Sequence, residues 1–331
     1  MRALVTGGGG FLGKAIVRRL VERGDWVRTL HRGLYPDLER LGVEQVRGDI
    51  ADSHAVEQAV RGVDVVFHVA AKVNMWGPIE PFRLANVVGT ENVLAAMRQH
   101  SVRKLVFTSS PSVVHGKEDL AGVDESAPYP EEYEAAYAET KAAAERAVLA
   151  ANSQDLATVA LRPHLIWGPE DTNLVPQLVK RARAGHLRLV GGGDNLVDTV
   201  YVDNAAHAHL LACDRLEPDA ICAGRAYFIT NGEPRPLKEI VNGILAAAGL
   251  PPVEKTVSLR FALTIGSVVE TAHRLLPLRG EPRMTRIIAR HLGTTHWYDI
   301  SAARRDLGYE PLVSFDEGLQ RLADWFRTGV S

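Results

Sequence analysis

The chain of 331 residues has little cysteine, few aromatic residues and almost no net charge. Its two cysteines, Cys213 and Cys222, are too few for a disulfide framework and favour buried thiols in a reducing cytosol. Lys and Arg number 38 against 40 Asp and Glu, so there is no basic surplus to hold nucleic acid or an anionic membrane surface. These absences argue against a disulfide-rich secreted domain and against a nucleic-acid-binding protein.

Long apolar runs are also missing. The longest apolar stretch late in the chain, residues 261–269, is too short to span a bilayer and runs into charged residues. The glycine turn that begins at residue 7 leaves no room for a signal peptide before the first strand. We therefore expect a cytoplasmic protein that does not span a membrane.

A glycine-rich turn, Thr6-Gly-Gly-Gly-Gly-Phe-Leu-Gly13, follows an apolar run and leads into a helical pattern. Strand, glycine turn and helix form the context that a dinucleotide fingerprint needs. Gly7 makes the tight turn, Gly10 lets backbone N–H groups approach a pyrophosphate, and Gly13 lets helix and strand pack closely. The alternative is a plain glycine turn, and the flanking strand and helix patterns favour the nucleotide site.

Strand and helix patterns alternate through the first half of the chain, which predicts an α/β fold with a Rossmann-type, doubly wound parallel sheet. We expect strands at residues 3–6, 26–31, 44–47, 64–68, 104–108 and 157–162, and helices near 11–23, 52–61, 80–99 and 136–152. Residues 199–212 predict a short strand and a helix that return to the sheet, and further helices are expected near 236–248 and 315–327. The expected dinucleotide-binding domain is residues 1–163 plus about 197–229, and the smaller, mixed substrate lobe is about 164–196 plus 230–331.

Tyr137 and Lys141 lie four residues apart in the helical pattern of residues 136–152, so they share a helix face. A phenol that titrates near ~10 in water acts near neutrality only where a neighbouring cation favours its ionised form. Lys141 can supply that cation, although such pairs are also common on solvated helix faces. The pair gains meaning from the hydroxyl-rich segment 108–112, because ligands bind outside the carboxyl ends of parallel strands.

These motifs, in this order, resemble the extended short-chain dehydrogenase/reductase superfamily, as do Asn86-Val-Val-Gly-Thr90, Leu161-Arg-Pro163 and Trp167-Gly-Pro169. The resemblance implies that Tyr137 donates a proton to a carbonyl oxygen as hydride arrives from a nicotinamide, while Lys141 tunes the tyrosine. It implies that Ser110 hydrogen-bonds the same oxygen, with Ser112 as the alternative. It also implies that Asn86 supports the lysine.

The cofactor is expected to be NADP(H), with NAD(H) as the alternative. Specificity for NAD usually rests on an acidic residue about 20 positions past the glycine motif, where this chain has His31 and Arg32. Arg32 can hold a 2′-phosphate through its guanidinium fork, and His31 can assist. Asp49 and Ile50 are expected to line the adenine, and other cofactor contacts are expected at Phe11, Leu12, Ala70, Ala71, Lys72, Asn86, Thr108 and Pro163.

The segments Leu161-Arg-Pro-His-Leu-Ile-Trp-Gly-Pro169 and His296-Trp-Tyr-Asp299 are similar to bacterial 2-alkyl-3-oxoalkanoate reductases of long-chain olefin biosynthesis. This resemblance implies NADP-dependent reduction of a hydrophobic β-keto acid, with substrate contacts at Ser112, Trp76, Trp167 and His164. The segments Arg162-Pro-His164 and Asn231-Gly-Glu-Pro234 are similar to 3β-hydroxysteroid and sterol-4α-carboxylate dehydrogenases, which makes a sterol-like substrate the alternative.

Two other interpretations are weaker. A sugar-nucleotide epimerase or dehydratase usually has an arginine for the diphosphate where this chain has Val197. Non-catalytic NADP-binding relatives tend to lose the Tyr–Lys pair, which this chain keeps. No metal site is predicted, because His291 and His296 lack a partner at ligand spacing. The resemblance implies a homodimer through residues 80–99 and 136–152, and it leaves room for association with other enzymes of the same pathway.

Overall fold

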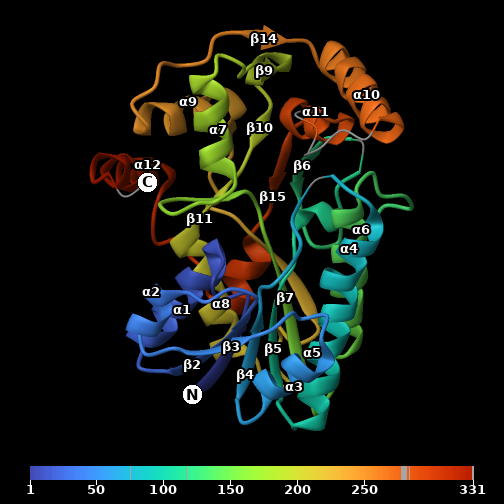
Figure 1. Cartoon of the computed structure of the whole chain (residues 1–331), viewed down its shortest axis with the longest axis vertical. Coiled ribbons are helices and arrows are strands. Elements are labelled where there is room, and N and C mark those ends of the chain that lie inside the picture. The colour runs from blue at the N-terminus through green and yellow to red at the C-terminus, as the bar shows by residue number, and fades with distance from the viewer. Residues whose placement is uncertain (75, 117, 277–281, 283, 330–331) are drawn as a thin grey trace.

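The computed structural model describes the chain except for residues 75, 117, 277–281, 283 and 330–331. A large sheet with its helices fills the lower half of the molecule in Figure 1, and smaller elements fill the upper half. The large sheet has seven strands in the order β12-β7-β5-β4-β1-β2-β3. All pairings within it are parallel. The predicted Rossmann-type sheet, accompanied by a smaller mixed sheet, is confirmed.

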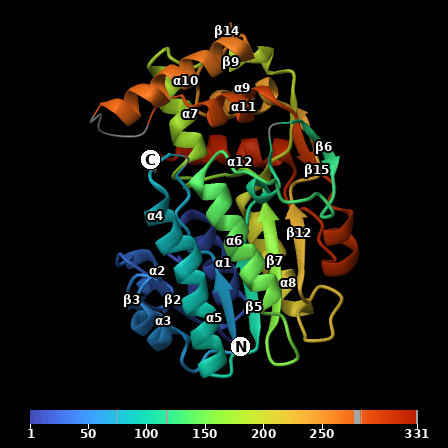
Figure 2. The same cartoon turned by 90° about the vertical axis from the view of Figure 1, so that its right-hand side faces the viewer.

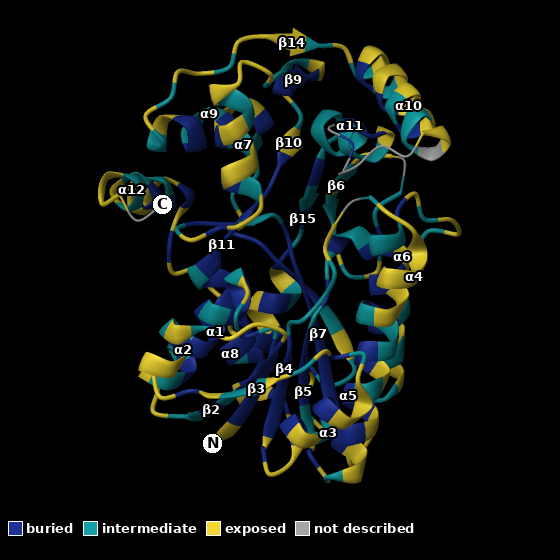
Figure 3. Ribbon diagram, in the orientation of Figure 1, coloured by how far each residue is buried: buried dark blue, intermediate teal, exposed yellow. Residues whose placement is uncertain are grey.

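The strands of the large sheet are β1 (Arg2–Thr6), β2 (Trp26–His31), β3 (Glu44–Arg47), β4 (Val65–His68), β5 (Lys104–Thr108), β7 (Ala157–Pro163) and β12 (Arg225–Ile229). The first six match the predicted strands to within one residue at each end. Continuous apolar runs mark strands that are buried on both faces. Figure 3 shows the central strands of the sheet mostly coloured as buried, whereas β3 at the edge has no buried residue.

The prediction that residues 199–212 return a strand to the large sheet is wrong. β11 (Val200–Tyr201) pairs instead with β8 (Ile166–Trp167), away from that sheet, and α8 (Val202–Arg215) begins at once. The seventh place is taken by β12, which pairs with β7 along its whole length. A strand of two residues before a helix is too short to cross the sheet.

Helices cover both faces of the large sheet. α1 (Phe11–Glu22) packs with α8 on one face, and α3 (Ser53–Val60), α5 (Gly89–Gln99) and α6 (Ala136–Ala150) cover the other. α1 buries Leu12, Ile16 and Leu20 at helical spacing, so its apolar stripe faces the sheet. Each face has its own apolar cluster, as a doubly wound sheet requires.

The helix predicted at residues 80–99 is interrupted. It consists of α4 (Ile79–Phe82), a π-helical segment η1 (Arg83–Val88) and α5. In Figure 2, α4, α5 and α6 lie on the side of the molecule that faces the viewer. The π-helical segment contains Asn86, which is buried. Such segments frequently lie at functional sites.

The remaining elements are mostly short. A second sheet has the order β13-β10-β15-β6, and β9 pairs with β14. The strands are β6 (Leu120–Val123), β9 (Leu189–Val190), β10 (Leu196–Val197), β13 (Arg235–Pro236), β14 (Thr256–Val257) and β15 (His296–Tyr298). The helices are α2 (Pro36–Arg40), η2 (Pro111–Val113), α7 (Leu174–Arg183), η3 (Gly191–Gly193), α9 (Leu237–Ala247), α10 (Leu259–Leu275), α11 (Arg286–Gly293), η4 (Ala303–Leu307) and α12 (Phe315–Arg327). The predicted division into two domains stays a prediction.

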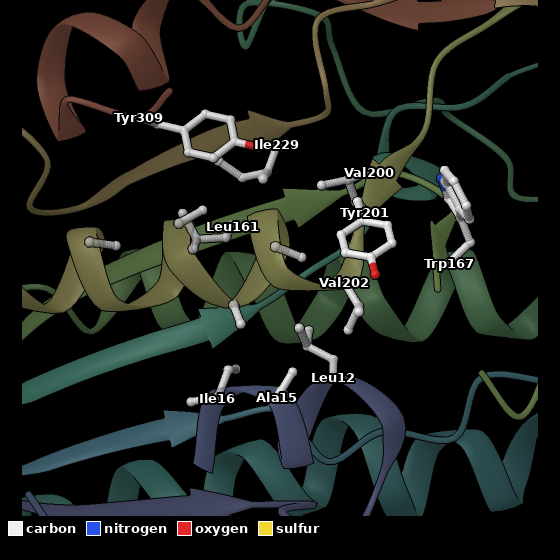
Figure 4. Close-up of a cluster of buried hydrophobic side chains, with 14 of the residues drawn as sticks. Leu12, Ala15, Ile16, Leu161, Trp167, Val200, Tyr201, Val202, Ile229 and Tyr309 are labelled. Carbon is white, nitrogen blue, oxygen red and sulfur yellow. The ribbon is translucent and has the colours of Figure 1, made fainter. Parts of the chain in front are cut away.

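Trp167 belongs to the core, which corrects its prediction as a substrate contact. Its side chain is fully buried, lies edge-on to Tyr201 and donates a hydrogen bond from Nε1 to Thr199 Oγ1 over 2.9 Å. Figure 4 shows Trp167 and Tyr201 in the same buried cluster as Leu12 of α1. An indole whose N–H is satisfied inside the protein fills a core.

Across the part of the chain that the structure describes, no helix is both long and apolar enough to cross a membrane.

Candidate active site

The strand order reverses at β1, which lies between β2 and β4, and ligands of such sheets bind at the carboxyl end of this switch point. The glycine turn sits there. Gly7 has a φ of +71°, and a Cβ on Gly13 would lie 2.2 Å from the Gly7 carbonyl oxygen. Side chains at these positions would strain or block the turn. Gly10 precedes α1 without a capping side chain, so the first N–H groups of α1 remain for an anion such as a pyrophosphate.

A buried histidine that the sequence did not single out braces this turn. His68, at the end of β4, bonds Thr6 Oγ1 through Nδ1 over 2.7 Å and Thr90 Oγ1 through Nε2 over 3.0 Å. Thr6 Oγ1 also accepts hydrogen bonds from the backbone N–H groups of Val69 and Ala70, both at 3.2 Å. These bonds place the segment of Ala70, Ala71 and Lys72 beside the glycine turn. No motif spacing pointed to His68, because its partners come from distant segments.

Asn86 connects three elements at the same edge of the sheet. Its Oδ1 accepts a hydrogen bond from the Lys72 backbone N–H over 2.8 Å, and its Nδ2 donates to the Lys72 carbonyl over 3.2 Å. Nδ2 also donates to Thr140 Oγ1 over 3.0 Å, which is the residue before Lys141 in α6. The predicted support of the lysine by Asn86 therefore runs through Thr140 and the α6 backbone in this structure.

Tyr137 and Lys141 lie one turn apart at the start of α6. Lys141 is buried, and its Nζ donates a hydrogen bond to the carbonyl oxygen of Thr108, at the end of β5, over 2.6 Å. Burial lowers the pKa of Lys141 to about 7, and the negative charge of Glu145 opposes that shift. An ammonium held this close to neutrality is readily tuned by whatever binds beside it.

The Tyr137 hydroxyl has an environment set by burial and by a neighbouring serine. Burial raises the pKa of Tyr137, and a hydrogen bond with the Ser110 side chain lowers it. Ser110 Oγ also accepts a hydrogen bond from the Ser112 backbone N–H over 3.2 Å, which fixes the start of η2. Of the two candidate serines, Ser110 is thus the one bonded to Tyr137, whereas Ser112 Oγ is buried without a partner among the described residues.

A buried ion pair lies beneath this site. Glu145, one turn after Lys141, accepts hydrogen bonds from Arg162 Nε over 2.9 Å and Arg162 Nη2 over 2.7 Å. The Tyr129 hydroxyl donates to the same carboxylate over 2.7 Å. The guanidinium of Arg162 and these bonds lower the pKa of Glu145 against its burial, so the carboxylate stays ionised and favours the charged form of Lys141.

Two pockets meet beside Tyr137. The narrower one has a volume of about 20 Å³ and is lined by Ser112, His115, Gly116, Glu134, Ala135, Tyr137, Ala138, Ile287, Arg290 and His291. The wider one, of about 370 Å³, is lined by Trp76, Gly77, Pro78, Phe82, Glu134, Ala135, Ala136 and His273. We call them the Tyr137 pocket and the Trp76 pocket. Glu134 and Ala135 line both, so the two pockets are neighbours.

Four histidines cluster behind and beside the Tyr137 pocket. The rings of His115 and His291 stack with centroids 4.4 Å apart, and the His296 ring lies 5.5 Å from that of His115. Burial lowers the pKa of His115 to about 3 and that of His291 to about 4. These rings are therefore neutral at pH 7. No group of His, Cys, Asp and Glu among the described residues has the geometry of a metal site.

His164 does not reach the pocket, which corrects its prediction as a substrate contact. Its Nδ1 bonds Asp198 Oδ1 over 2.7 Å, and its ring packs edge-on against His296, with centroids 5.0 Å apart. It lies in the layer behind the pocket-lining rings because β15 covers it. Pro163, the residue before it, ends β7 at the same edge of the sheet.

The adenosine end of the predicted cofactor site is only partly as expected. Arg32, which follows the end of β2, and Asp49, which follows β3, are both exposed. Ile50 is buried and packs against Gly89. His31 is buried, with Nδ1 bonded to the Gly33 carbonyl over 2.7 Å and Nε2 to Thr29 Oγ1 over 3.0 Å. Burial also lowers the pKa of His31. Its predicted assistance to a phosphate is therefore wrong, since both ring nitrogens are engaged and the ring is neutral.

Buried histidines also make a prediction about acid stability. Burial lowers the pKa of His68 to about 3 and that of His209, which bonds Thr108 Oγ1 over 2.8 Å, to about 4. Below ~6.5 the unfolded chain binds protons there that the folded chain does not, so the free energy of unfolding falls as the pH falls. We expect each ring to cost roughly 2–3 kcal/mol between neutral pH and pH ~4.5. Urea unfolding across this range measures it, and His209→Gln should show a shallower pH dependence; an unchanged slope would contradict the assignment.

Comparisons with known proteins agree with this geometry. A sequence profile of the 3-beta hydroxysteroid dehydrogenase/isomerase family matches residues 4–260. The chain is 56% identical to a 2-alkyl-3-oxoalkanoate reductase of Stenotrophomonas maltophilia, over 97% of this chain and 98% of that protein. It is 37% identical to a 3 beta-hydroxysteroid dehydrogenase/Delta 5-->4-isomerase of Mycobacterium tuberculosis, over 98% of this chain and 90% of that protein.

Among solved structures, the UDP-glucose 4-epimerase of Thermus thermophilus in complex with NAD superposes with a TM-score of 0.75 and 27% identity, over 100% of both chains. This similarity extends the shared fold to the whole length of the chain. Since the family profile spans most of the sequence and its relatives match nearly end to end, the chain belongs to the 3-beta hydroxysteroid dehydrogenase/isomerase family, a group of NAD(P)-dependent oxidoreductases within the extended short-chain dehydrogenases/reductases.

Proposed function

We propose that this protein reduces the 3-oxo group of a 2-alkyl-3-oxoalkanoate to the 3-hydroxy acid with NADPH, as a step of long-chain olefin biosynthesis in the cytoplasm. One observation carries the proposal. Tyr137 lines a narrow pocket that lies beside a wider one lined by Trp76 and Phe82. A branched β-keto acid has a small polar head beside long alkyl chains, and these two pockets fit that shape. The 2-alkyl-3-oxoalkanoate reductases that resemble the chain support the same substrate.

Tyr137, Ser110 and Lys141 have different roles in the proposed reaction. When bound, the nicotinamide supplies the hydride to the carbonyl carbon. Tyr137 donates its hydroxyl proton to the carbonyl oxygen, and Ser110 donates a hydrogen bond to the same oxygen as negative charge develops on it. The Lys141 ammonium favours the tyrosinate that remains, and with its Nζ at the Thr108 carbonyl it would also hold a ribose hydroxyl of the bound cofactor. The glycine turn and the first N–H groups of α1 hold the pyrophosphate.

An activity screen tests this function. The purified protein is incubated with a 2-alkyl-3-hydroxyalkanoic acid or a 3β-hydroxysteroid, each with NADP⁺ and NAD⁺, and the reduced cofactor is measured by absorbance. We expect the highest kcat/KM with the hydroxy acid and NADP⁺. Higher kcat/KM with the hydroxysteroid would favour the sterol function instead. The 37% identity to a 3 beta-hydroxysteroid dehydrogenase is the reason for testing that substrate.

The sugar-nucleotide alternative is disfavoured by one residue. The Thermus thermophilus epimerase shares the fold, but Val197 in this chain is fully buried in β10, between β13 and β15. A buried valine offers no charge to a diphosphate. The observation counts against a sugar nucleotide.

We propose that NADPH is preferred because Arg32 holds the 2′-phosphate. A charge-assisted hydrogen bond is worth about 1.5–3 kcal/mol, so Arg32→Ala should weaken NADPH binding roughly 10- to 100-fold. NADH has no phosphate at this position, and its affinity should barely change. Fluorescence titration of both cofactors into the wild type and the variant measures the effect.

A matched control is available in α2. Arg40 is also exposed, eight residues further on, and its Nε bonds the Pro36 carbonyl. Arg40→Ala should leave both affinities unchanged. Equal losses of NADPH and NADH affinity in Arg32→Ala would mean that Arg32 supports the adenine pocket or the fold, and the preference for NADP would lose its physical basis.

We also propose a homodimer through α4–η1–α5 and α6. These segments lie side by side and form one outer face of the molecule in Figure 2. Each helix returns the chain between parallel strands, so α5 and α6 run parallel to each other, and two copies of the pair can pack into a four-helix seam. Association with other enzymes of the same pathway stays a prediction.

A further inference from the structure

Two buried polar atoms in the Tyr137 pocket have no partner. They are Ser112 Oγ and Arg290 Nε, and both remain unpaired when every described residue is considered. Buried donors in native proteins are nearly always satisfied, so an unsatisfied pair in one pocket points to a group that binds there. Ser112 comes from η2 and Arg290 from α11, so the two donors face the pocket from different elements.

The charges around this pocket favour an anion. Among the described residues that line it, Arg290 carries the positive charge, because His115 and His291 are neutral at pH 7 for the reason given above. Glu134 lies across from it, with Oε1 3.4 Å from Arg290 Nη2. That contact uses the far end of the guanidinium and leaves the Nε–H group free to donate.

Arg290 is held in place by its helix. Thr285 caps the N-terminus of α11 by accepting a hydrogen bond from the Ile288 N–H over 3.2 Å, and Ala289 is fully buried. At the other end, the His291 carbonyl accepts a hydrogen bond from His296 Nε2 over 2.8 Å. A guanidinium on an anchored helix loses less freedom when it binds a ligand.

We propose that Arg290 and Ser112 bind the carboxylate of the β-keto acid, with Arg290 Nε–H and Ser112 Oγ–H donating to its oxygens. The inference rests on the proposed function and deepens it. In a β-keto acid the carboxylate carbon is two bonds from the carbonyl carbon, so a carbonyl held at Tyr137 places the carboxylate in the same pocket. The free volume of about 20 Å³ corresponds to about one water, so this pocket has no room for the alkyl chains, which are left for the Trp76 pocket.

The assignment separates the two serines and makes Arg290 a specificity residue. Ser110 acts on the carbonyl oxygen through its place beside Tyr137, whereas Ser112 acts on the carboxylate. A neutral ester or hydroxysteroid lacks the charge that Arg290 meets, so binding it would leave the buried Arg290 Nε–H group without an anionic acceptor. The structure thus predicts a preference for acids over neutral alcohols of the same size.

The test compares a 2-alkyl-3-hydroxyalkanoic acid with its methyl ester in the NADP⁺-dependent oxidation. This direction is chosen because free β-keto acids readily lose carbon dioxide. Wild type should show a lower KM for the acid than for the ester. Arg290→Gln should raise the KM for the acid roughly 10- to 100-fold, with a much smaller change in kcat and in the KM for the ester. Ser112→Ala should raise the KM for the acid in the same direction but less.

Arg286→Gln is the matched control. Arg286 is one turn earlier in α11, where its Nε bonds Glu270 Oε2 over 2.8 Å outside the pocket. It should change neither KM. Circular dichroism and NADPH titration of all variants verify that fold and cofactor site are kept.

The outcomes separate the two proposals. If the acid is oxidised well but Arg290→Gln raises the KM for acid and ester equally, or raises neither, the carboxylate site is overturned and the proposed function stands. If wild type oxidises a neutral hydroxysteroid in preference to the acid and Arg290→Gln leaves both unaffected, both proposals are overturned.

Discussion

Tyr137→Phe is expected to lower kcat at least ~10²-fold, the lower end for the loss of a positioned acid–base group. The phenylalanine ring keeps the packing of the first turn of α6 but has no proton to give to the carbonyl oxygen. Because the variant leaves the proposed cofactor contacts, the glycine turn and Arg32, unchanged, NADPH affinity should stay the same. Steady-state kinetics of the purified variant and fluorescence titration of NADPH measure the two quantities.

Tyr133→Phe provides the control for this change. Tyr133 lies one turn before Tyr137, and its hydroxyl donates a hydrogen bond to the Val113 carbonyl over 3.1 Å. Removing that hydroxyl should affect stability slightly and leave kcat within a few-fold of wild type. Near-wild-type turnover in Tyr137→Phe would remove the tyrosine from the reaction.

Ser110→Ala is expected to reduce kcat by roughly 10²-fold, as loss of one donor to a developing oxyanion does. The same change removes the bond that lowers the pKa of Tyr137, so the pH at which activity is lost on the alkaline side should rise. A pH–rate profile of wild type and variant measures both effects, and thermal unfolding shows whether the start of η2 is disturbed.

Ser112→Ala gives the contrast. It should retain most of the kcat of wild type, because Ser112 Oγ has no bond to Tyr137. If Ser112→Ala instead loses the larger share of kcat and Ser110→Ala loses little, the oxyanion role belongs to Ser112.

Local patterns made the large sheet and the Tyr137–Lys141 pair predictable. The predicted strands β1, β4, β5 and β7 contain buried runs of apolar residues, and both faces of such a strand must be covered. The glycine turn and the Tyr-x-x-x-Lys spacing are also contained in a few neighbouring residues, so backbone geometry alone relates their parts. The same holds for the helix predicted at 136–152, which begins and ends close to α6.

What the sequence could not supply depends on contacts between distant segments. Arg290 of α11 and Ser112 of η2 line one pocket although they are far apart in the chain, and no spacing in the sequence records that they are neighbours. Trp167 is an aromatic residue of the kind that often lines an apolar pocket, but in this structure its ring packs against Tyr201 and Phe315. His31 ends β2, where a phosphate ligand could lie, but the Gly33 carbonyl two residues on accepts a hydrogen bond from its Nδ1. Strands of two residues, such as β10 and β11, form because neighbouring strands pair with them, and they are too short to show the alternating pattern that predicts a strand from sequence.

The path of β6 has a consequence for how the protein unfolds. The chain leaves the large sheet after β5, places β6 beside β15 in the second sheet, and returns to the large sheet through α6 and β7. Because Ser110, Ser112 and Tyr137 lie along this detour, loosening either sheet would pull the reaction centre apart. The two sheets should therefore melt in one cooperative transition. A ligand that bridges them would raise the melting temperature of the whole chain, so thermal shift can rank candidate substrates without any turnover.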